Sequence, residues 1–440
     1  MRETRLFNIL IFLSVFVSSI TFFRDPFEGY FHYIIFLLLF PVFLLKFGLP
    51  KKIIGSIFIL FVVGVLEIFL GNNTWPLFLK IFLGFVLSVS FYGYVLDYFK
   101  FDTQKIFSFY IKGAIIVSYI GLFQFVFYYL RFTPGYNFSW LFNKWGLVSG
   151  GFGIRVNSIF SEPAQCAIVL APACFVAIYN LISRNKKYLL TKFQSVLIIL
   201  VTFLTTSSTG YIGLLFILLF LLYNYGKISY FFLGVPFIIL VSFLLYNNVP
   251  DFKSRIDTSL GLWVDGDFRI QNINSSSFII YNNYHIAQEN FLSNPFTGTG
   301  LGSHPIAFDK YSFTNRSDII DLQFNKADGN SLLIRLISET GILGVVFIFV
   351  FMRRFYVRRD PFNVDATFWI ISNSVLIIII LYLLRQGNYF LNAFPLFMWI
   401  YYYARKNHVQ RIQTLNDERL ANEDEELSLE RGIIGTEAEV

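Results

Sequence analysis

Apolar runs long enough to cross a lipid bilayer recur along almost the whole sequence. A crossing takes about 20 predominantly apolar residues in a helix. Only helices and closed barrels satisfy every backbone hydrogen bond within lipid. The sequence therefore predicts an all-α polytopic integral membrane protein with about twelve transmembrane helices. The runs lie at roughly 6–23, 30–48, 53–70, 77–97, 106–130, 162–182, 189–206, 209–224, 229–247, 331–352, 366–384 and 388–403.

The composition agrees with this class and argues against a soluble protein. Of the 440 residues, 55% are hydrophobic and only 14% are charged, whereas a single soluble core stops growing at about 250–300 residues. The net charge of +7 would suit nucleic acid, but the basic residues mostly flank the apolar runs. We therefore expect a membrane as partner and no nucleic acid. The amino terminus lacks a clear cleavage site, which favours a retained first helix.

The distribution of Lys and Arg predicts how the chain is oriented. With a cytoplasmic amino terminus, the short inside connections, such as "KFGLPKK" and "SRNKKYLLTK", are all basic. The short outside ones, such as "GNNTWP" and "RQGN", carry at most one cation. Positive charge stays on the cytoplasmic side of membranes, so both termini are expected there. Residues 1–403 form the polytopic domain, and residues 404–440 are expected to be an acidic, partly disordered or loosely helical cytoplasmic tail.

Two outside connections are much longer than turns. They are residues 131–161 and residues 248–330, a large periplasmic loop between the ninth and tenth spans. Loops of such length are usually functional. Within the second, "YNNYHIAQENFLSNPFTGTGLGSH" predicts an amphipathic helix that ends at the "NPFTGTGLG" turn cluster. No repeat at a fixed period is visible, which argues against a transporter with repeated halves.

Charged residues and histidines gather on the outer side of this topology, where we expect one outward-facing cavity. Four of them keep a plain alternative. Glu162, before Pro163, suits a helix cap. Arg335 and Glu339, four residues apart, suit mutual neutralisation, and Arg385 suits a snorkelling anchor. An intramembrane charge nevertheless marks a functional site by default. The set comprises Arg155, Glu162, Arg269, His285, His304, Arg316, Asp328, Arg335, Glu339 and Arg385.

Several motifs of known enzyme classes are missing from the sequence, which reduces the number of reaction types to consider. The sequence has no metal-binding spacing, no phosphate-binding Walker loop and no G-x-S-x-G elbow, so we expect neither a metal nor a cofactor. Many arginines with few carboxylates suit transfer from a diphosphate-linked donor, because guanidinium groups match the oxygens of the leaving pyrophosphate. One carboxylate or histidine would then act as base for the incoming hydroxyl.

Four phrases of the sequence carry a resemblance to a known family. In order, they are "RVNSIFSEPAQCAIVLAP", "LTTSSTGYIGLLFILL", "NPFTGTGLGS" and "DGNSLLIRLISETGILGVVFIF". They resemble the O-antigen polymerase and O-antigen ligase superfamily of bacterial envelope enzymes, over most of the chain from about residue 150 to 400. The resemblance implies a GT-C-like fold and a metal-independent glycosyltransferase that acts on undecaprenyl-pyrophosphate-linked oligosaccharide at the periplasmic face of the inner membrane.

The resemblance also implies roles for single residues. Arg155, and with it Arg269 and Arg385, would bind the pyrophosphate. The ligase branch commonly has a histidine where this chain has Asp328 in "ADGNSLL", which favours the Wzy-type polymerase branch. Glu162 is a candidate for the base or for a group that orients an arginine.

The expectation is therefore a polysaccharide repeat-unit polymerase, with O-antigen ligase and a transporter or flippase of lipid-linked oligosaccharide as alternatives. His304 and Asp328 are alternates for the base, and Arg335 with Glu339 would support the cavity. Control of chain length would need a separate regulator protein as partner.

Overall fold

Helices make up 76% of the computed structural model, and there is almost no sheet. The structure describes residues 2–23, 28–48, 51–150, 152–183, 188–226, 250–264, 275–316, 325–359 and 367–437, with a few positions between 236 and 248. The elements are α1 (Arg2–Phe16), α2 (Phe31–Phe47), α3 (Lys51–Phe69), α4 (Trp75–Tyr98), α5 (Thr103–Tyr129), α6 (Thr133–Tyr136), β1 (Val148–Gly150), β2 (Gly153–Arg155), α7 (Pro163–Ile182), α8 (Lys192–Leu204), α9 (Ser208–Asn224), α11 (Pro250–Trp263), α12 (Ser275–Ser293), α13 (His304–Tyr311), η2 (Phe313–Arg316), α14 (Leu332–Arg354), α15 (Thr367–Arg385), η3 (Leu391–Ala393) and α16 (Phe394–Glu437).

Each predicted apolar run that the structure describes contains a helix, although α16 begins only at Phe394 within the run 388–403. The run 229–247 lies almost entirely outside the described residues. Five helices, α4, α5, α7, α14 and α15, are long and apolar enough to cross a membrane. Shorter apolar helices also occur at α1, α2, α3, α8 and α9. These findings agree with an all-α membrane protein, and the number of twelve spans stays a prediction.

The first predicted span, 6–23, is wrong at its carboxyl end, because α1 stops at Phe16. The hydroxyls of the next two serines bond elsewhere: Ser18 Oγ donates to Gln165 Oε1 of α7 at 2.7 Å, and Ser19 Oγ donates to the carbonyl of Ile159 at 2.7 Å. A β-bridge then joins Thr21 to Tyr30. Contacts with the distant 131–161 loop and α7 thus hold the chain extended where the apolar run alone would continue a helix.

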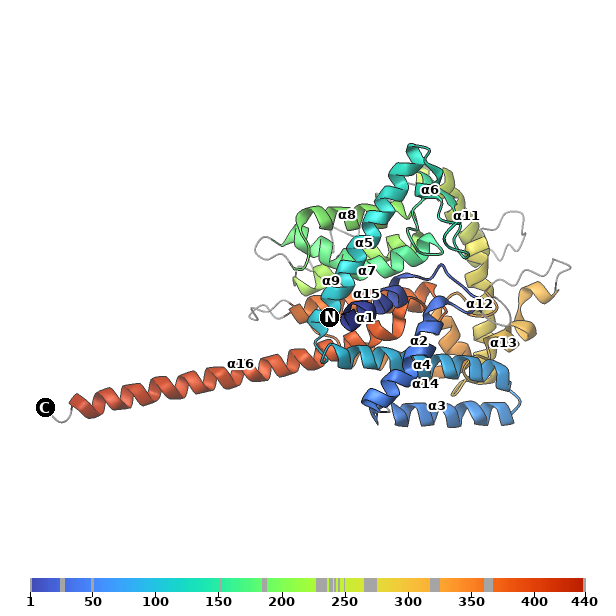
Figure 1. Ribbon diagram of the computed structural model, residues 1–440. Coiled ribbons are helices and arrows are strands. Elements are labelled where there is room, and N and C mark those ends of the chain that lie inside the picture. The colour runs from blue at the N-terminus through green and yellow to red at the C-terminus, as the bar shows by residue number, and fades with distance from the viewer. Residues whose placement is uncertain are drawn as a thin grey trace.

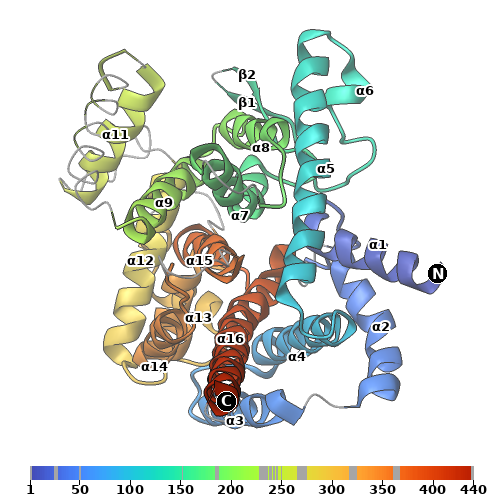
Figure 2. The same ribbon diagram turned by 90° about the vertical axis from the view of Figure 1, so that its left-hand side faces the viewer.

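Two helices, α7 and α15, form the centre of the bundle. Of the apolar window of each, 83% is buried, against 33% for α14, and Figure 2 shows α15 surrounded by α7, α9, α14 and α16. Small residues allow this packing: a Cβ added to Gly210 or Gly213 of α9 would lie within 4 Å of Ala167 or Ala171 of α7. The outer helices instead expose large apolar side chains, as a bilayer requires.

The carboxy-terminal segment is a continuation of the last apolar helix. Helix α16 spans 44 residues and projects far beyond the bundle (Figure 1). Residues 404–437 are therefore helical, where the sequence suggested a partly disordered or loosely helical tail. Good helix formers such as Glu, Leu, Arg and Gln dominate the segment, and Arg419 pairs with Glu423 one turn later at 2.8 Å. Helices α11, α12 and α13 lie at the opposite end of the molecule in Figure 1.

Helix α14 is broken at Gly341, and the broken turn is filled by another part of the chain. Gly341 has φ 57° and ψ −151°, so the helical hydrogen bonds cannot continue across it. The "NPFTGTGLG" segment, which follows α12 as predicted, docks here. The backbone N–H groups of Ile342 and Leu343 donate to the carbonyls of Pro295 and Phe296, and those of Thr299 and Gly300 donate to the carbonyls of Ser338 and Glu339. The phrase therefore satisfies backbone groups that the break leaves free.

Candidate functional site

Six connections lie on the predicted outer side: "RDPFEG", "GNNTWP", residues 131–161, "TTSST", residues 248–330 and "RQGN". Each is bonded to at least one of the others. Glu28 of the first connection forms an ion pair with Lys144 of the 131–161 loop. Arg155 of the same loop donates through Nε to the carbonyl of Thr205 at 3.3 Å. Asn73 Nδ2 donates to the carbonyl of Leu301 at 2.9 Å. At the last connection, Arg335 Nη1 donates to the carbonyl of Gly387 at 3.0 Å, and Arg385 Nη2 donates to Ser276 Oγ at 3.0 Å. The candidate residues thus gather at one end of the bundle.

The segment before α7 is fixed by polar side chains from α5 and from itself. Gln124 Oε1 accepts from the backbone N–H groups of Asn157 and Ser158 at 3.2 and 2.8 Å, and its Nε2 donates to Asn157 Oδ1 at 2.9 Å. Ser161 Oγ donates to Gln165 Oε1 at 2.9 Å. All of these groups are buried. Residues 157–161 are therefore rigid, which sets the positions of Arg155 and Glu162 on either side of them.

Glu162 occupies the N-cap position of α7, and Pro163 follows as the first helical residue. Its side chain accepts no hydrogen bond from the helix backbone, so capping does not account for it. The side chain is exposed, yet the protein around it displaces enough water to raise the pKa of the carboxyl above its usual value. Lys144 opposes that rise, Asp328 and Glu28 add to it, and Arg155 opposes it more weakly. The carboxyl of Glu162 is thus accessible to solvent and has two cations and two other carboxylates as electrostatic neighbours.

Lys144 is a residue that the sequence analysis did not single out. It forms an ion pair with Glu28 and donates to Tyr30 Oη at 2.5 Å, while the Tyr30 hydroxyl donates to Glu28 Oε2. Its ammonium also lies 4.6 Å from the centroid of the Tyr30 ring. Lys144 is the single lysine in the 131–161 loop, and this isolation was the one feature of the sequence that could have identified it as a candidate. Its partner Glu28 lies more than 100 residues earlier in the chain.

Asp328 lies in a turn that leads into α14. One oxygen, Oδ1, accepts from Asn325 Nδ2 at 3.0 Å and from the backbone N–H of Asn330 at 3.1 Å, an Asx-type turn. The turn packs closely on the α15–α16 connection, because a Cβ added to Gly387 would lie 1.6 Å from the carbonyl oxygen of Asp328. Only glycine fits at 387, and this contact fixes the position of Asp328 relative to the α15–α16 connection.

His304 lies behind the same turn. A Cβ at Gly329 would meet its Nε2 at 3.1 Å, and that nitrogen is hydrogen-bonded to Asn283 Oδ1 at 2.9 Å. The ring is fully buried, and burial, together with the positive charge of Arg335, lowers the pKa of His304 to about 3. It is therefore neutral at physiological pH and shielded from solvent, which makes it a weaker candidate than Glu162 for accepting a proton from a bound ligand.

Arg335 and Glu339 form the buried ion pair that their spacing allows. Arg335 Nε donates to Glu339 Oε1 at 2.6 Å, and both side chains are almost completely buried. The other carboxylate oxygen accepts from the hydroxyl of Tyr389 at 2.9 Å, and the guanidinium lies 4.4 Å from the Tyr389 ring centroid. With the bond from Arg335 to Gly387, the pair joins α14 to the α15–α16 connection and thereby supports the Asp328 turn.

These groups belong to one electrostatic unit, which we call the charged cluster. Lys80 of α4, a second residue that the sequence analysis did not select, interacts with Arg335, Glu28, Asp328 and Glu339. A lysine inside the apolar run 77–97 was a visible signal, because such charges are costly in lipid. The charged cluster consists of Glu28, Lys80, Lys144, Arg155, Glu162, Asp328, Arg335 and Glu339.

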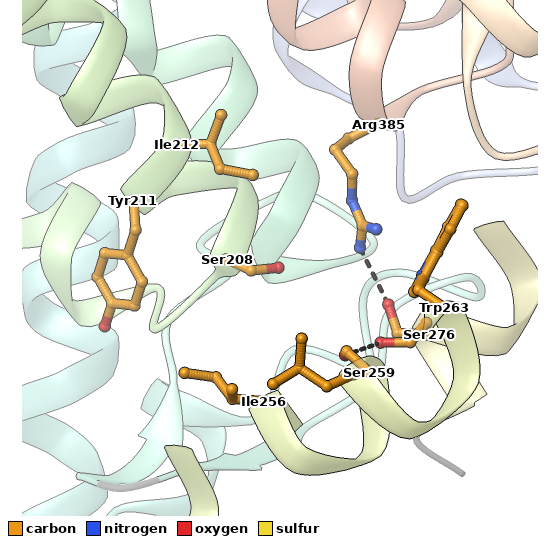
Figure 3. Close-up of a pocket in the computed structure, with 10 residues that line it drawn as sticks. Ser208, Tyr211, Ile212, Ile256, Ser259, Trp263, Ser276 and Arg385 are labelled. Carbon is orange, nitrogen blue, oxygen red and sulfur yellow. Dashed lines mark hydrogen bonds between the residues drawn. The ribbon is translucent and has the colours of Figure 1, made fainter. Parts of the chain in front are cut away.

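Arg385 lies apart from the charged cluster. It reaches into a cavity of about 590 Å³ between α9, α11, α12 and the end of α15, where it bonds to Ser276 (Figure 3). Its position in a cavity does not match a simple snorkelling anchor. The hydrogen-bond partner of Arg155, Thr205, precedes Ser208 of the cavity wall by three residues. Arg269, the third predicted pyrophosphate ligand, lies outside the described residues.

No protein-family model matches the chain, and no curated protein matches it. The charged cluster and the cavity of Arg385 are therefore the features that bear on function.

Proposed function

We propose that this protein is a polysaccharide repeat-unit polymerase of the O-antigen type, a metal-independent glycosyltransferase with a lipid-pyrophosphate-linked donor. The observation that supports it most is the exposed carboxyl of Glu162, with a raised pKa, beside the cations Lys144 and Arg155. A base of raised pKa next to fixed cations suits a reaction in which a hydroxyl attacks and an anionic group leaves.

In the proposed reaction, Glu162 removes the proton from a hydroxyl on the non-reducing sugar of one lipid-linked repeat unit. The hydroxyl oxygen forms a bond to the anomeric carbon of the growing chain on a second lipid. The bond between that carbon and the pyrophosphate oxygen breaks, and its electron pair leaves with undecaprenyl pyrophosphate. Arg155 and Lys144 stabilise the negative charge on the departing phosphate. The proton on Glu162 passes to water when the products separate.

The other members of the charged cluster act as support. Within the part of the chain that the structure describes, the hydrogen bonds of the turn engage only Oδ1 of Asp328, which leaves Oδ2 for a sugar hydroxyl. Arg335 and Glu339 hold the turn through Gly387 and Tyr389. Breaking these contacts would shift Asp328 without touching substrate, so we assign the pair a positioning role.

The proposal extends to cell location and partners. The protein would reside in the bacterial inner membrane with both termini in the cytoplasm, and the charged cluster would face the periplasm, as the distribution of Lys and Arg predicts. A separate chain-length regulator would act on it there.

The test is gel analysis of surface polysaccharide from a strain that lacks the gene, with the wild-type or variant protein restored. We expect the ladder to collapse to a single-repeat band without the protein and with Glu162→Gln or Arg155→Gln. Arg131→Gln, an exposed arginine of the same loop, is the matched control and should restore the ladder. Full-length polymer left on the lipid carrier would instead indicate a ligase, and repeat units trapped on the cytoplasmic side would indicate a flippase.

A further inference from the structure

The cavity around Arg385 has the dimensions of a ligand site. Its volume of about 590 Å³ lies within the range of about 300–1,000 Å³ that is usual for small-molecule sites. Its walls come from three separate parts of the chain: α9, α11 with the start of α12, and the last residue of α15. Figure 3 shows Arg385 on one side, directed at Ser276, and the apolar side chains of Ile212 and Ile256 on the other.

The charge in this cavity is not compensated by the part of the protein that the structure describes. Arg385 is half-buried and donates to the uncharged hydroxyl of Ser276. Among the described residues it forms no ion pair, and no carboxylate interacts with it. Holding a guanidinium away from water costs free energy unless an anion balances it, so the cavity is suited to a ligand that brings one negative charge.

The remaining lining is typical of carbohydrate recognition. Ser208, Ser259, Ser276 and Ser277 supply hydroxyls that both donate and accept hydrogen bonds. The indole of Trp263 presents a large, half-exposed apolar face, and such faces cover the C–H side of a sugar ring while the hydroxyls meet polar groups. A phosphate without a sugar would use the arginine and the serines and leave the indole unoccupied.

We propose that this cavity binds a sugar residue that carries a carboxylate, with Arg385 on the carboxylate and Trp263 against the ring. The two terminal nitrogens of a guanidinium match the two oxygens of a carboxylate in one plane. A doubly substituted pyrophosphate carries two charges, whereas Arg385 is the only cation that lines the cavity among the described residues. The proposed function adds that this sugar belongs to the repeat unit, so that the cavity selects substrates with an acidic residue.

This assignment separates Arg385 from the pyrophosphate role that the sequence suggested. The cations that surround Glu162 are Lys144 and Arg155, and Arg385 is not among its electrostatic neighbours. The leaving group would therefore be bound at the charged cluster, and a sugar farther along the glycan would be bound at Arg385, on the other side of the Thr205–Ser208 turn.

The test is ligand binding to the full-length protein in lipid nanodiscs, followed by saturation-transfer difference NMR. The probes are methyl glycosides of glucuronic and galacturonic acid, their neutral counterparts and inorganic pyrophosphate. We expect saturation of an acidic glycoside but not of its neutral counterpart, with affinity about tenfold weaker or more in Arg385→Gln. Ser276→Ala should weaken binding less, and Trp263→Ala should abolish saturation of the ring protons. Arg131→Gln, at an exposed arginine outside both the cavity and the charged cluster, should leave glycoside binding unchanged.

Three results would overturn the proposal. The first is equal saturation of acidic and neutral glycosides, and the second is no binding of any acidic glycoside. The third is that pyrophosphate displaces the bound glycoside from the wild-type protein at a lower concentration than free glycoside does. The last would return the cavity to the lipid pyrophosphate. Arg385→Lys, which keeps the charge, guards against misfolding and should retain part of the binding. Because the readout is binding, a protein that binds acidic glycosides but makes no polymer would refute the polymerase alone.

Discussion

Replacing Gly387 by alanine should displace Asp328 from the charged cluster, because the added Cβ would clash with the Asp328 carbonyl group. A Cβ at this position would lie 1.6 Å from the carbonyl oxygen of Asp328 and 2.6 Å from its carbonyl carbon. Since ordinary contact begins at 3.4 Å, the two connections must separate by about 1.8 Å. Gly387 also accepts the bond from Arg335, so the buried ion pair is drawn along with it.

The magnitude follows from that displacement. Misplacing a catalytic group by about 1 Å can reduce a rate by about 100-fold, so we expect Gly387→Ala to lower polymer formation by about 100-fold or more. Overpacking of this kind costs about 1–3 kcal/mol of stability, which leaves most of a membrane protein folded. Gly387→Ala should therefore lower the rate of polymer formation strongly while the amount of folded protein falls little.

The assay is the length distribution of lipid-linked polymer made by purified protein from lipid-linked repeat units, with protein amount and monodispersity measured in parallel. Gly146→Ala is the matched control, because a Cβ there meets nothing within 4 Å and the residue lies in the loop that also carries Lys144. Equal polymer from the two variants, at equal amounts of folded protein, would refute the argument that Asp328 must stay where Gly387 allows it.

Three further predictions concern the same end of the bundle. Arg335→Met should destabilise the protein by about 3–5 kcal/mol, because it leaves the buried charge of Glu339 without its cationic partner. The double change Arg335→Met with Glu339→Met should recover most of that loss in thermal unfolding. The raised pKa of Glu162 places the acid limb of the pH–rate profile above the ordinary value of 4.5: a base works ionised, so activity should rise as pH passes through the raised pKa, and Glu162→Gln should remove it. Gly298→Ala should cost more than Gly226→Ala in the same unfolding assay, because φ is positive at both (63° and 64°) but only at 298 does a Cβ meet backbone, 2.5 Å from the carbonyl carbon of Glu339.

Each of these expectations has a contrary outcome. A double variant of Arg335 and Glu339 no more stable than the single one would mean that the pair stabilises the fold in itself. A pH profile unchanged by Glu162→Gln would exclude this carboxyl as the base. Equal losses at 298 and 226 would show that the loop does not dock into the α14 break as tightly as the geometry indicates.

The sequence by itself determined the helices. An apolar run in lipid must satisfy its backbone hydrogen bonds locally, so its length and position are sufficient to predict a helix, and the predicted and observed bounds agree to within a few residues for most runs. The end of α12 at Ser293 could be read from the "NP" and glycine pattern that follows. Where helices deviate, as at α1 and at Gly341 of α14, a distant segment supplies the hydrogen bonds.

The sequence also selected most members of the charged cluster, because charges are rare in a chain of this composition. Glu162, Asp328, Arg335 and Glu339 could be selected in this way, and the structure brings them together. The pairing of Arg335 with Glu339 followed from helical spacing alone.

Only the tertiary structure decided how the site is divided. The contact of Lys144 with Glu28 joins residues 116 apart, and that of Arg385 with Ser276 joins residues 109 apart. No local pattern encodes such contacts, since they depend on how the helices pack. For the same reason Arg385, a candidate equal to Arg155 in the sequence, lies in a separate cavity. Backbone hydrogen bonds in lipid are local and readable from sequence, whereas the meeting of side chains at the ends of helices is a property of the packed bundle.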